Sequence, residues 1–320
     1  MGREAALAMC EYADHLSNNG ACLHPLEFDP PFFDCEEAGE LPVLVELGSG
    51  TGIVAGRIAD STFFPEDGII VATDLPDVCP LLEKNLRKPG SVSSLSTSSK
   101  GSRVLVRPLA WGNIDHPISI AQELGWCRNT STICGSRMPR TPRLTHIICS
   151  DLVGIHFRLD VRDFKPLSPQ VYFPELFAPL LRTLIHLTSL SFPTSVDSKP
   201  VKIVISYKIR SLPKESPFWS AFGLWFTFQP VLFRRGATHC NDGGMAEELG
   251  ERWSKFGAVD ADSQDRIFIF VAYRRPESFA WEVPPSDWDL IDGVGARGTP
   301  ARKGDDTFET LLFMAMEGVE

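Results

Sequence analysis

The stretch Glu46-Leu47-Gly48-Ser49-Gly50-Thr51-Gly52 decides the fold of this chain. It follows the apolar run Pro42-Val43-Leu44-Val45, which has the composition of a buried strand, and it precedes residues 53–59, which open a helix. Glycines at alternating positions let the backbone turn tightly and approach a ligand without a Cβ clash. A strand, glycine loop and helix in this order predict an α/β fold with a small-molecule site at the loop.

Two classes of ligand use a glycine turn of this kind. A dinucleotide site has the pattern G-x-G-x-x-G, which needs glycine at position 53, where this chain has Ile53. The pattern here is G-x-G-x-G, and Glu46 before it can pair with the methionine ammonium of S-adenosylmethionine, a group that dinucleotides lack. Asp74 can accept hydrogen bonds from both ribose hydroxyls, but either ligand predicts that acid. Glu46 and Ile53 therefore favour S-adenosylmethionine, and a turn without any ligand is the third interpretation.

Strand-like and helix-like segments alternate along the chain. Apolar runs predict strands over residues 68–74, 103–107, 146–151 and 201–207, and helices over residues 4–16, 79–86 and 173–190. Residues 222–233 and 266–273 are predicted to form a final β pair. The series predicts an α/β fold: a seven-stranded, mostly parallel, doubly wound sheet of the Rossmann-like type, with an antiparallel final β pair.

Three parts of the chain are expected. Residues 1–40 form an N-terminal helix and loop, with Ala5, Leu7, Ala8 and Tyr12 able to share one helix face. Residues 41–275 form the main domain, with insertions near 129–143 and 153–170. Residues 276–320 form a C-terminal extension, whose residues 307–316 read as a short amphipathic helix that Asp305 or Asp306 can cap.

The bulk composition narrows the class of protein. The chain has 320 residues and a formal net charge of -10, which disfavours nucleic acid as a partner. Its eight cysteines are scattered without a C-x-x-C pair, so we expect free thiols and no metal site. No signal pattern or membrane-length apolar run is present, so we expect no membrane and a cytoplasmic or nuclear location.

Further candidate residues follow the predicted strands. Ligands of an open α/β sheet bind beyond the carboxyl ends of its strands. Trp111 follows the third strand and either stacks on the adenine, closes its pocket, contacts the sulfonium through its ring or simply packs in the core. Ser150 and Asp151 end the fourth strand. The predicted cofactor-binding set is Glu46, Gly48, Ser49, Gly50, Gly52, Asp74, Trp111 and Ser150.

Several motifs together resemble a known family. They are Leu44-Val45-Glu46-Leu47-Gly48-Ser49-Gly50-Thr51-Gly52, Ala72-Thr73-Asp74, Leu109-Ala110-Trp111-Gly112, Cys149-Ser150-Asp151-Leu152-Val153, Tyr172-Phe173-Pro174-Glu175-Leu176 and Ser206-Tyr207-Lys208-Ile209-Arg210. Over roughly residues 3–275 the chain resembles the seven-strand (class I) S-adenosylmethionine-dependent methyltransferases. Within them it is most similar to the lysine methyltransferases of methyltransferase family 16, fungal members above all.

The resemblance implies an activity and a partner. It implies an N-methyltransferase that uses S-adenosyl-L-methionine to methylate a lysine of a protein substrate, with translation factors and chaperones as the family's kinds of target. A lysine nucleophile must lose its proton, and Asp151 and Tyr172 are the candidate catalytic residues that orient the amine. Residues 207–210 either line the substrate entrance or form a solvated turn. A small-molecule, nicotinamide-like N-methyltransferase and a non-catalytic cofactor-binding homologue are the alternatives.

The chain departs from the family pattern at two places. The family has Asp-x-x-Tyr after the fourth strand, whereas Asp151 here is followed by Leu152-Val153-Gly154. Deleting residues 153–170 would restore the pattern as Ser-Asp-Leu-Val-Tyr-Phe-Pro-Glu-Leu, so we hypothesise an insertion or an unspliced intron there. Family members also carry a tryptophan-containing segment before the first helix, and this sequence begins inside that helix, so we expect a shortened start.

Overall fold

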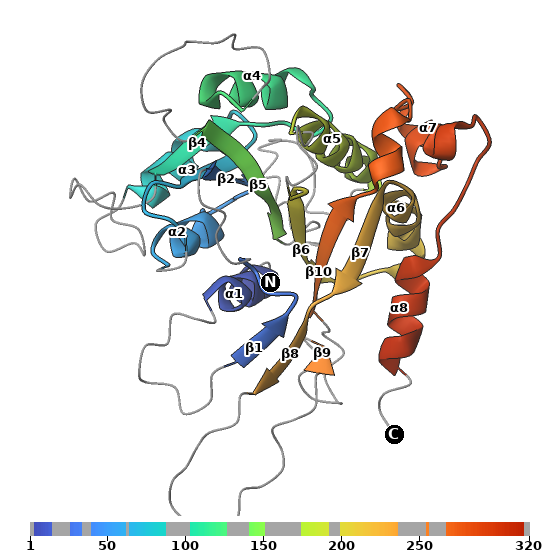
Figure 1. Ribbon diagram of the computed structural model, residues 1–320, viewed down its shortest axis with the longest axis horizontal. Coiled ribbons are helices and arrows are strands. Elements are labelled where there is room, and N and C mark those ends of the chain that lie inside the picture. The colour runs from blue at the N-terminus through green and yellow to red at the C-terminus, as the bar shows by residue number, and fades with distance from the viewer. Residues whose placement is uncertain are drawn as a thin grey trace, which may run out of the picture.

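A single mixed sheet organises the chain. In the computed structural model it has the order β4-β3-β2-β5-β6-β10-β7 (Figure 1). Neighbouring strands are parallel from β4 to β6, whereas β10 is antiparallel to both β6 and β7. The strands are β2 (Glu40–Leu47), β3 (Ile69–Asp74), β4 (Arg103–Pro108), β5 (Thr141–Ser150), β6 (Lys202–Lys208), β7 (Phe226–Pro230) and β10 (Ile267–Arg274). The predicted seven-stranded, mostly parallel α/β fold is confirmed.

The structure describes residues 3–14, 26–33, 40–61, 64–87, 103–126, 141–150, 174–191, 199–235, 254–255 and 267–316. Within them, six helices accompany the sheet. They are α1 (Arg3–Asp14), α2 (Ile53–Ala59), α3 (Cys79–Leu86), α4 (Asp115–Leu124), α5 (Phe177–Leu190) and α6 (Leu212–Trp225).

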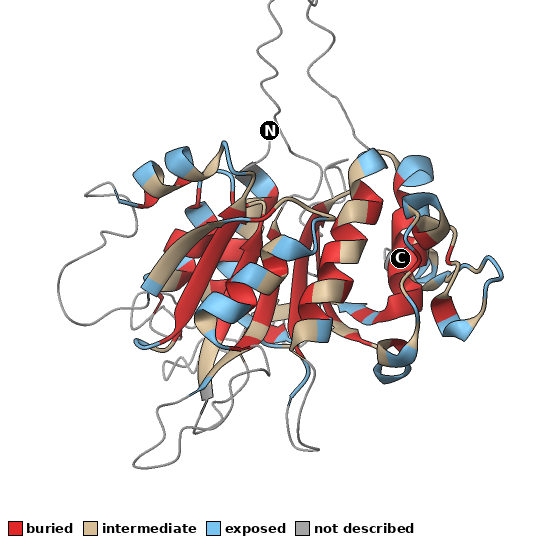
Figure 2. Ribbon diagram, turned by 90° about the horizontal axis from the view of Figure 1, so that it is seen from above, coloured by how far each residue is buried: buried red, intermediate tan, exposed pale blue. Residues whose placement is uncertain are grey.

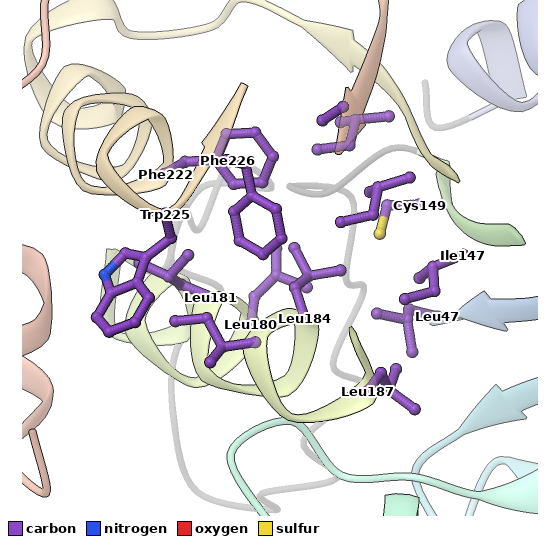
Figure 3. Close-up of a cluster of buried hydrophobic side chains, with 14 of the residues drawn as sticks. Leu47, Ile147, Cys149, Leu180, Leu181, Leu184, Leu187, Phe222, Trp225 and Phe226 are labelled. Carbon is purple, nitrogen blue, oxygen red and sulfur yellow. The ribbon is translucent and has the colours of Figure 1, made fainter. Parts of the chain in front are cut away.

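Successive side chains of the central strands point to opposite faces of the sheet and belong to two separate hydrophobic cores. Val43, Val45 and Leu47 of β2 face α4, α5 and α6, whereas Leu44 between them faces α1, α2 and α3. Buried strands therefore lie between two helical layers whose outer faces are exposed (Figure 2). Figure 3 shows the first core, with α5 leucines packed between the sheet and the aromatic residues Phe222, Trp225 and Phe226.

The boundary between α6 and β7 differs from the sequence-based prediction. Residues 222–225 were expected in a strand, but they form the end of α6, which begins at Leu212. The start of this helix is stabilised by buried Glu215, which accepts hydrogen bonds from the Arg210 and Ser211 amides. Phe222 and Trp225 lie in the core, so a helix buried on several sides gave an apolar run like that of a strand. The antiparallel final pair itself is confirmed, as β7 and β10.

The N-terminal region also differs in detail. Ala5 and Tyr12 of the predicted helix face are buried together with Met9, whereas Leu7 is 58% exposed and does not share that face. β1 (Leu26–Asp29) pairs with β8 (Leu232–Arg235), which pairs with β9 (Ser254–Lys255), in a small second sheet that the sequence did not predict. α4 was not predicted either, and β5 begins at Thr141, so residues 141–143 of the expected insertion belong to a strand.

The C-terminal part packs onto the layer formed by α5 and α6. It contains η2 (Pro276–Ala280), α7 (Asp287–Ile291), η3 (Ala296–Gly298) and α8 (Thr307–Met316). Phe308 of α8 is fully buried and stacks on Trp219 of α6 at a ring separation of 4.7 Å. The Asp305 side chain accepts a hydrogen bond from the Thr307 amide at the start of α8, as a capping residue does. Along the described ranges, no helix is both long and apolar enough to cross a membrane.

Candidate cofactor site

The ends of four adjacent strands bring the predicted residues to one edge of the sheet. β4, β3, β2 and β5 are parallel neighbours, so their carboxyl ends lie side by side. Leu47 at the end of β2 is in register with Thr73 of β3 and with Cys149 of β5. The glycine loop, Asp74, the segment around Trp111 and Ser150 therefore share this edge, which we call the carboxyl edge.

Three glycines of the loop adopt a conformation that other residues rarely take. Gly48, Gly50 and Gly52 have φ angles of 67°, 53° and 79°, in the left-handed region. A Cβ on Gly48 would lie 3.3 Å from Cζ2 of Trp111, and one on Gly52 would lie 2.8 Å from Cδ1 of Leu82. All three backbone angles disfavour any residue with a side chain, and at Gly48 and Gly52 a Cβ would also crowd Trp111 and Leu82.

Backbone amides fasten the glycine loop to β3 and to itself. The Ser49 amide donates to the Thr73 carbonyl at 2.8 Å, and the Gly52 amide donates to the Ser49 carbonyl at 2.8 Å. The Gly50 amide donates to Oδ2 of Asp74 at 2.8 Å. The Ser49 and Gly50 amides hold the loop against β3, and the Gly52 amide closes a turn within it, so the loop has a fixed shape before any ligand binds.

Asp74 joins the loop to the end of β3. Its Oδ2 accepts the Gly50 amide, and its Oδ1 accepts the amide of Leu75 at 2.7 Å. Each carboxylate oxygen can accept a further hydrogen bond. Asp74 is half-buried at the carboxyl edge, where it remains a candidate acceptor for ribose hydroxyls as well as a fastening point for the loop.

Glu46 lies beneath the loop, with 1% of its surface exposed. Its Oε2 accepts the Ala55 amide at 3.1 Å, which caps the first turn of α2 in place of Gly52, a residue without a side chain. Its Oε1 has no hydrogen-bond partner among the residues described. Burial raises the pKa of Glu46 to about 7, against the opposing effects of the Ser49 hydroxyl, the Ala55 amide and the Ser150 hydroxyl.

The segment around Trp111 is held by two residues that the sequence did not single out. His116 accepts the Ala110 amide through Nδ1 at 2.9 Å, and Thr183 of α5 accepts the Gly112 amide through Oγ1 at 2.9 Å. Gly112 has a φ of 82°, which turns the chain directly after Trp111. Gly112 in the sequence could have indicated a turn at this point. The contact with Thr183 could not have been predicted, because the two residues meet only in the folded chain.

The two predicted catalytic residues, Asp151 and Tyr172, lie outside the described residues, as does the segment 153–170 between them. Ser150, the last residue of β5, is half-buried and in register with Ser206 of β6. Its hydroxyl and that of Ser49 both favour the charged form of Glu46, so these three predicted residues are brought together. Tyr207, expected near a substrate entrance, is instead buried and donates a hydrogen bond to Glu215.

The residues at this edge fit S-adenosylmethionine. A buried carboxylate oxygen without a partner suits a cationic ligand group, since a charge left unpaired in the interior is costly. The left-handed glycines let the backbone come close to a ligand, and Asp74 and Trp111 offer a hydroxyl acceptor and an aromatic wall. The fold and this edge define the class of protein: an S-adenosylmethionine-dependent methyltransferase with the class I, Rossmann-like architecture.

One family model matches part of the chain. Residues 4–124 match the family model described as lysine methyltransferase, from the first turn of α1 to the end of α4. The matched part includes the glycine loop, Asp74 and Trp111, and it ends before β5. A comparison with curated proteins gives no significant match.

Solved structures with a similar course of the chain include other methyltransferases. One is the precorrin-6y C5,15-methyltransferase of Geobacter metallireducens, with 12% identity over 74% of this chain and 83% of that chain and a TM-score of 0.30. Another is an arsenic(III) S-adenosylmethionine methyltransferase of Chlamydomonas reinhardtii, with 12% identity over 87% of this chain and 77% of that chain and a TM-score of 0.31. Likenesses this weak carry no argument about substrate or site.

Proposed function

We propose that this protein transfers a methyl group from S-adenosylmethionine to the side-chain amine of a lysine in a protein substrate. The observation that carries the proposal is the match of residues 4–124 to the lysine methyltransferase model, which covers the glycine loop, Asp74 and Trp111. The motif Tyr172-Phe173-Pro174-Glu175-Leu176 supports it, since α5 follows that motif directly.

The cofactor supplies a methyl group on a sulfonium, which is already activated and departs as a neutral thioether. The task of the protein is therefore to bind the cofactor and the acceptor, to orient them toward each other, and to exclude water from the site. In the proposal, Gly48 and Gly50 admit the methionine part close to the backbone, Glu46 faces its ammonium, and Asp74 accepts from the ribose hydroxyls. Trp111 stands over Gly48 and forms the wall of the pocket.

The acceptor amine must arrive without its proton. An apolar pocket lowers the pKa of a lysine because desolvation disfavours the charged form. Asp151 and Tyr172 are proposed to orient the neutral amine toward the methyl group, with Asp151 directly after Ser150 in the sequence.

Transfer of radiolabelled methyl from the cofactor into a lysate, with endogenous methylation suppressed, tests the proposal. A discrete labelled protein whose label is recovered as methyllysine by mass spectrometry is the expected result. Label found only in the small-molecule fraction would assign the nicotinamide-like alternative. Cofactor binding by calorimetry without any transfer would assign a non-catalytic homologue.

Matched variants link any signal to this site. Gly48→Ala changes a residue at the carboxyl edge, whereas Gly125→Ala changes a glycine of similar φ, 74°, at the end of α4. Transfer should fall in the first variant and persist in the second. Equal loss in both would mean that the effect comes from backbone strain and not from the cofactor site.

A further inference from the structure

Trp111 lies in a connection whose backbone is fastened by side chains of two helices. Residues 109–113 follow β4 and precede α4, and they are here called the Trp111 turn. On one side of Trp111, the Ala110 amide donates to Nδ1 of His116, in the first turn of α4, at 2.9 Å. Because this ring nitrogen accepts an N–H, it carries no proton of its own in this arrangement. The peptide group that precedes the indole is therefore held by a side chain.

Thr183 of α5 fastens the other side of the turn. The Gly112 amide, directly after Trp111, donates to Oγ1 of Thr183 at 2.9 Å. The Thr183 hydroxyl donates its own proton to the Pro179 carbonyl at 2.9 Å, so its lone pairs remain free to accept the Gly112 amide. Thr183 is buried, and a Cβ on Gly112 would lie 3.2 Å from Cβ of Pro179. Water has little access to this hydroxyl, so the bond is not easily replaced.

The two hydrogen bonds decide where the indole ring lies. A tryptophan side chain has only two rotatable bonds, so the position of its ring follows the orientation of its backbone. The Trp111 ring packs against the core beside α4 and α5, and its Cζ2 would lie 3.3 Å from a Cβ on Gly48. The Leu109 amide donates to the Asp74 carbonyl at 2.8 Å, which ties the same turn to the end of β3. A rotation of the peptide groups beside Trp111 would move the ring away from the glycine loop.

We propose that His116 and Thr183 are positioning residues for the cofactor, which hold Trp111 as the wall of the S-adenosylmethionine pocket; this inference rests on the proposed function, in which Trp111 forms that wall. A ligand that binds only the fastened turn has an apparent affinity proportional to the fraction of molecules in which the turn is fastened. Removing either acceptor lowers this fraction. The loss of one neutral hydrogen bond shifts such an equilibrium about two- to tenfold.

The same helix offers a control for Thr183. Thr188, further along α5, is also buried, and its hydroxyl also donates to carbonyls within the helix. It accepts a hydrogen bond from Arg274 at 3.1 Å. Thr188→Val therefore removes a buried hydroxyl of the same kind without changing the Trp111 turn. It should lower the stability of the protein as Thr183→Val does, but it should not change cofactor binding.

Calorimetric titration of the full chain with S-adenosylmethionine tests the proposal. Thr183→Val and His116→Leu are each expected to raise the cofactor Kd about two- to tenfold, and the two together about tenfold or more. Thr183→Ser and His116→Asn keep an acceptor oxygen and should bring the Kd back to within about twofold of the wild type. Thr188→Val should bind the cofactor as the wild type does, and thermal unfolding should show that it is destabilised.

Trp111→Ala shows whether the two residues act through the indole. This change should itself raise the cofactor Kd. In its background, Thr183→Val and His116→Leu should alter the Kd by less than about twofold, because no ring is left to position. The change in tryptophan fluorescence on cofactor binding, assigned to Trp111 by its loss in Trp111→Phe, should shrink in Thr183→Val and persist in Thr188→Val.

Each opposite result has a definite meaning. A wild-type Kd in Thr183→Val or in His116→Leu would overturn the positioning role and leave the proposed function intact, as would an equal loss in Thr188→Val or an undiminished effect in the Trp111→Ala background. If Thr183→Val does not fold, His116→Leu decides, since His116 is only half-buried. An unchanged Kd in Trp111→Ala would remove the wall of the proposed pocket, and this inference with it. A wild type that binds no S-adenosylmethionine would overturn the proposed function itself.

Discussion

The backbone amide of Gly50 donates a hydrogen bond to Oδ2 of Asp74 across 2.8 Å, which joins the glycine loop to the end of the neighbouring strand. The two residues are far apart in sequence and meet because β2 and β3 are parallel neighbours. An acid at this position therefore both shapes the loop and offers acceptors at the carboxyl edge. Removing it should affect the loop and the ligand together.

Asp74→Ala is expected to weaken binding of S-adenosylmethionine by roughly 1–3 kcal/mol, because hydrogen bonds to a charged acceptor are lost. Asp74→Asn, which keeps one acceptor oxygen, should lose less. Isothermal titration calorimetry measures both. Asp77→Ala is the control, because Asp77 is exposed in the segment that directly follows Asp74. Unchanged binding in Asp74→Ala would show that the cofactor is placed incorrectly.

Glu46 should give the ligand-free protein a specific pH dependence. Burial raises its pKa from 4.5 to about 7, so the folded state holds a proton that the unfolded state releases in this range. Stability should therefore fall as pH rises from about 4.5 to 7 and level off above 7, with a contribution of about 3 kcal/mol or less. Glu46→Gln should abolish this component in chemical unfolding at a series of pH values. Parallel curves for the two proteins would contradict it.

Gly48 and Trp111 should be energetically coupled. Gly48→Ala strains the backbone at φ 67° and brings a Cβ to 3.3 Å from the Trp111 ring. The strain alone is expected to cost about 1–2 kcal/mol, as in Gly125→Ala, where no atom lies within 4 Å. A double-mutant cycle with Trp111→Ala should show a coupling of about 0.5 kcal/mol or more. Strict additivity would mean that the ring is free to move away.

Arg274 should fasten the C-terminal part to α5. Its guanidinium is buried and donates to the Ile185 carbonyl at 2.6 Å, to Ser189 at 2.9 Å and to the Ser278 carbonyl at 3.0 Å. Arg274→Met is expected to lower the free energy of unfolding by about 2–4 kcal/mol, since it leaves buried acceptors unpaired. Arg302→Ala should change it by less than about 0.5 kcal/mol, because Arg302 is exposed. Denaturant unfolding measures both, and equal effects would refute the fastening role.

Phe308 and Phe313 of the same helix should contribute very differently to stability. Phe308→Ala removes a ring stacked in the core and is expected to cost about 3–5 kcal/mol. Phe313→Ala should leave the free energy of unfolding within about 0.5 kcal/mol of the wild type. Thermal denaturation checks this pair. A large loss in Phe313→Ala would show that its side chain contributes to the core.

Much of the fold was predictable from local patterns. α3 and α8 were predicted with the bounds that the structure has, because their ends carry clear signals and their apolar residues recur at helical spacing. Residues 222–225 were predicted wrongly, because a helix buried on several sides has no amphipathic period to distinguish it from a strand. β1 and β8 were missed, since a short strand is defined by its partner and not by its own sequence.

The sequence by itself determined the class of fold and the ligand it suits, because the glycine positions, Glu46 and Asp74 are requirements of backbone geometry and charge within short segments. Only the tertiary structure decided how these residues work together. It buries Glu46 under the loop, with one oxygen that pairs with none of the described residues, ties Gly50 to Asp74, and sets Trp111 over Gly48. It also packs α8 onto α6, where Phe308 stacks on Trp219. Such contacts join segments distant in the chain, and their energies arise from packing that no local pattern encodes.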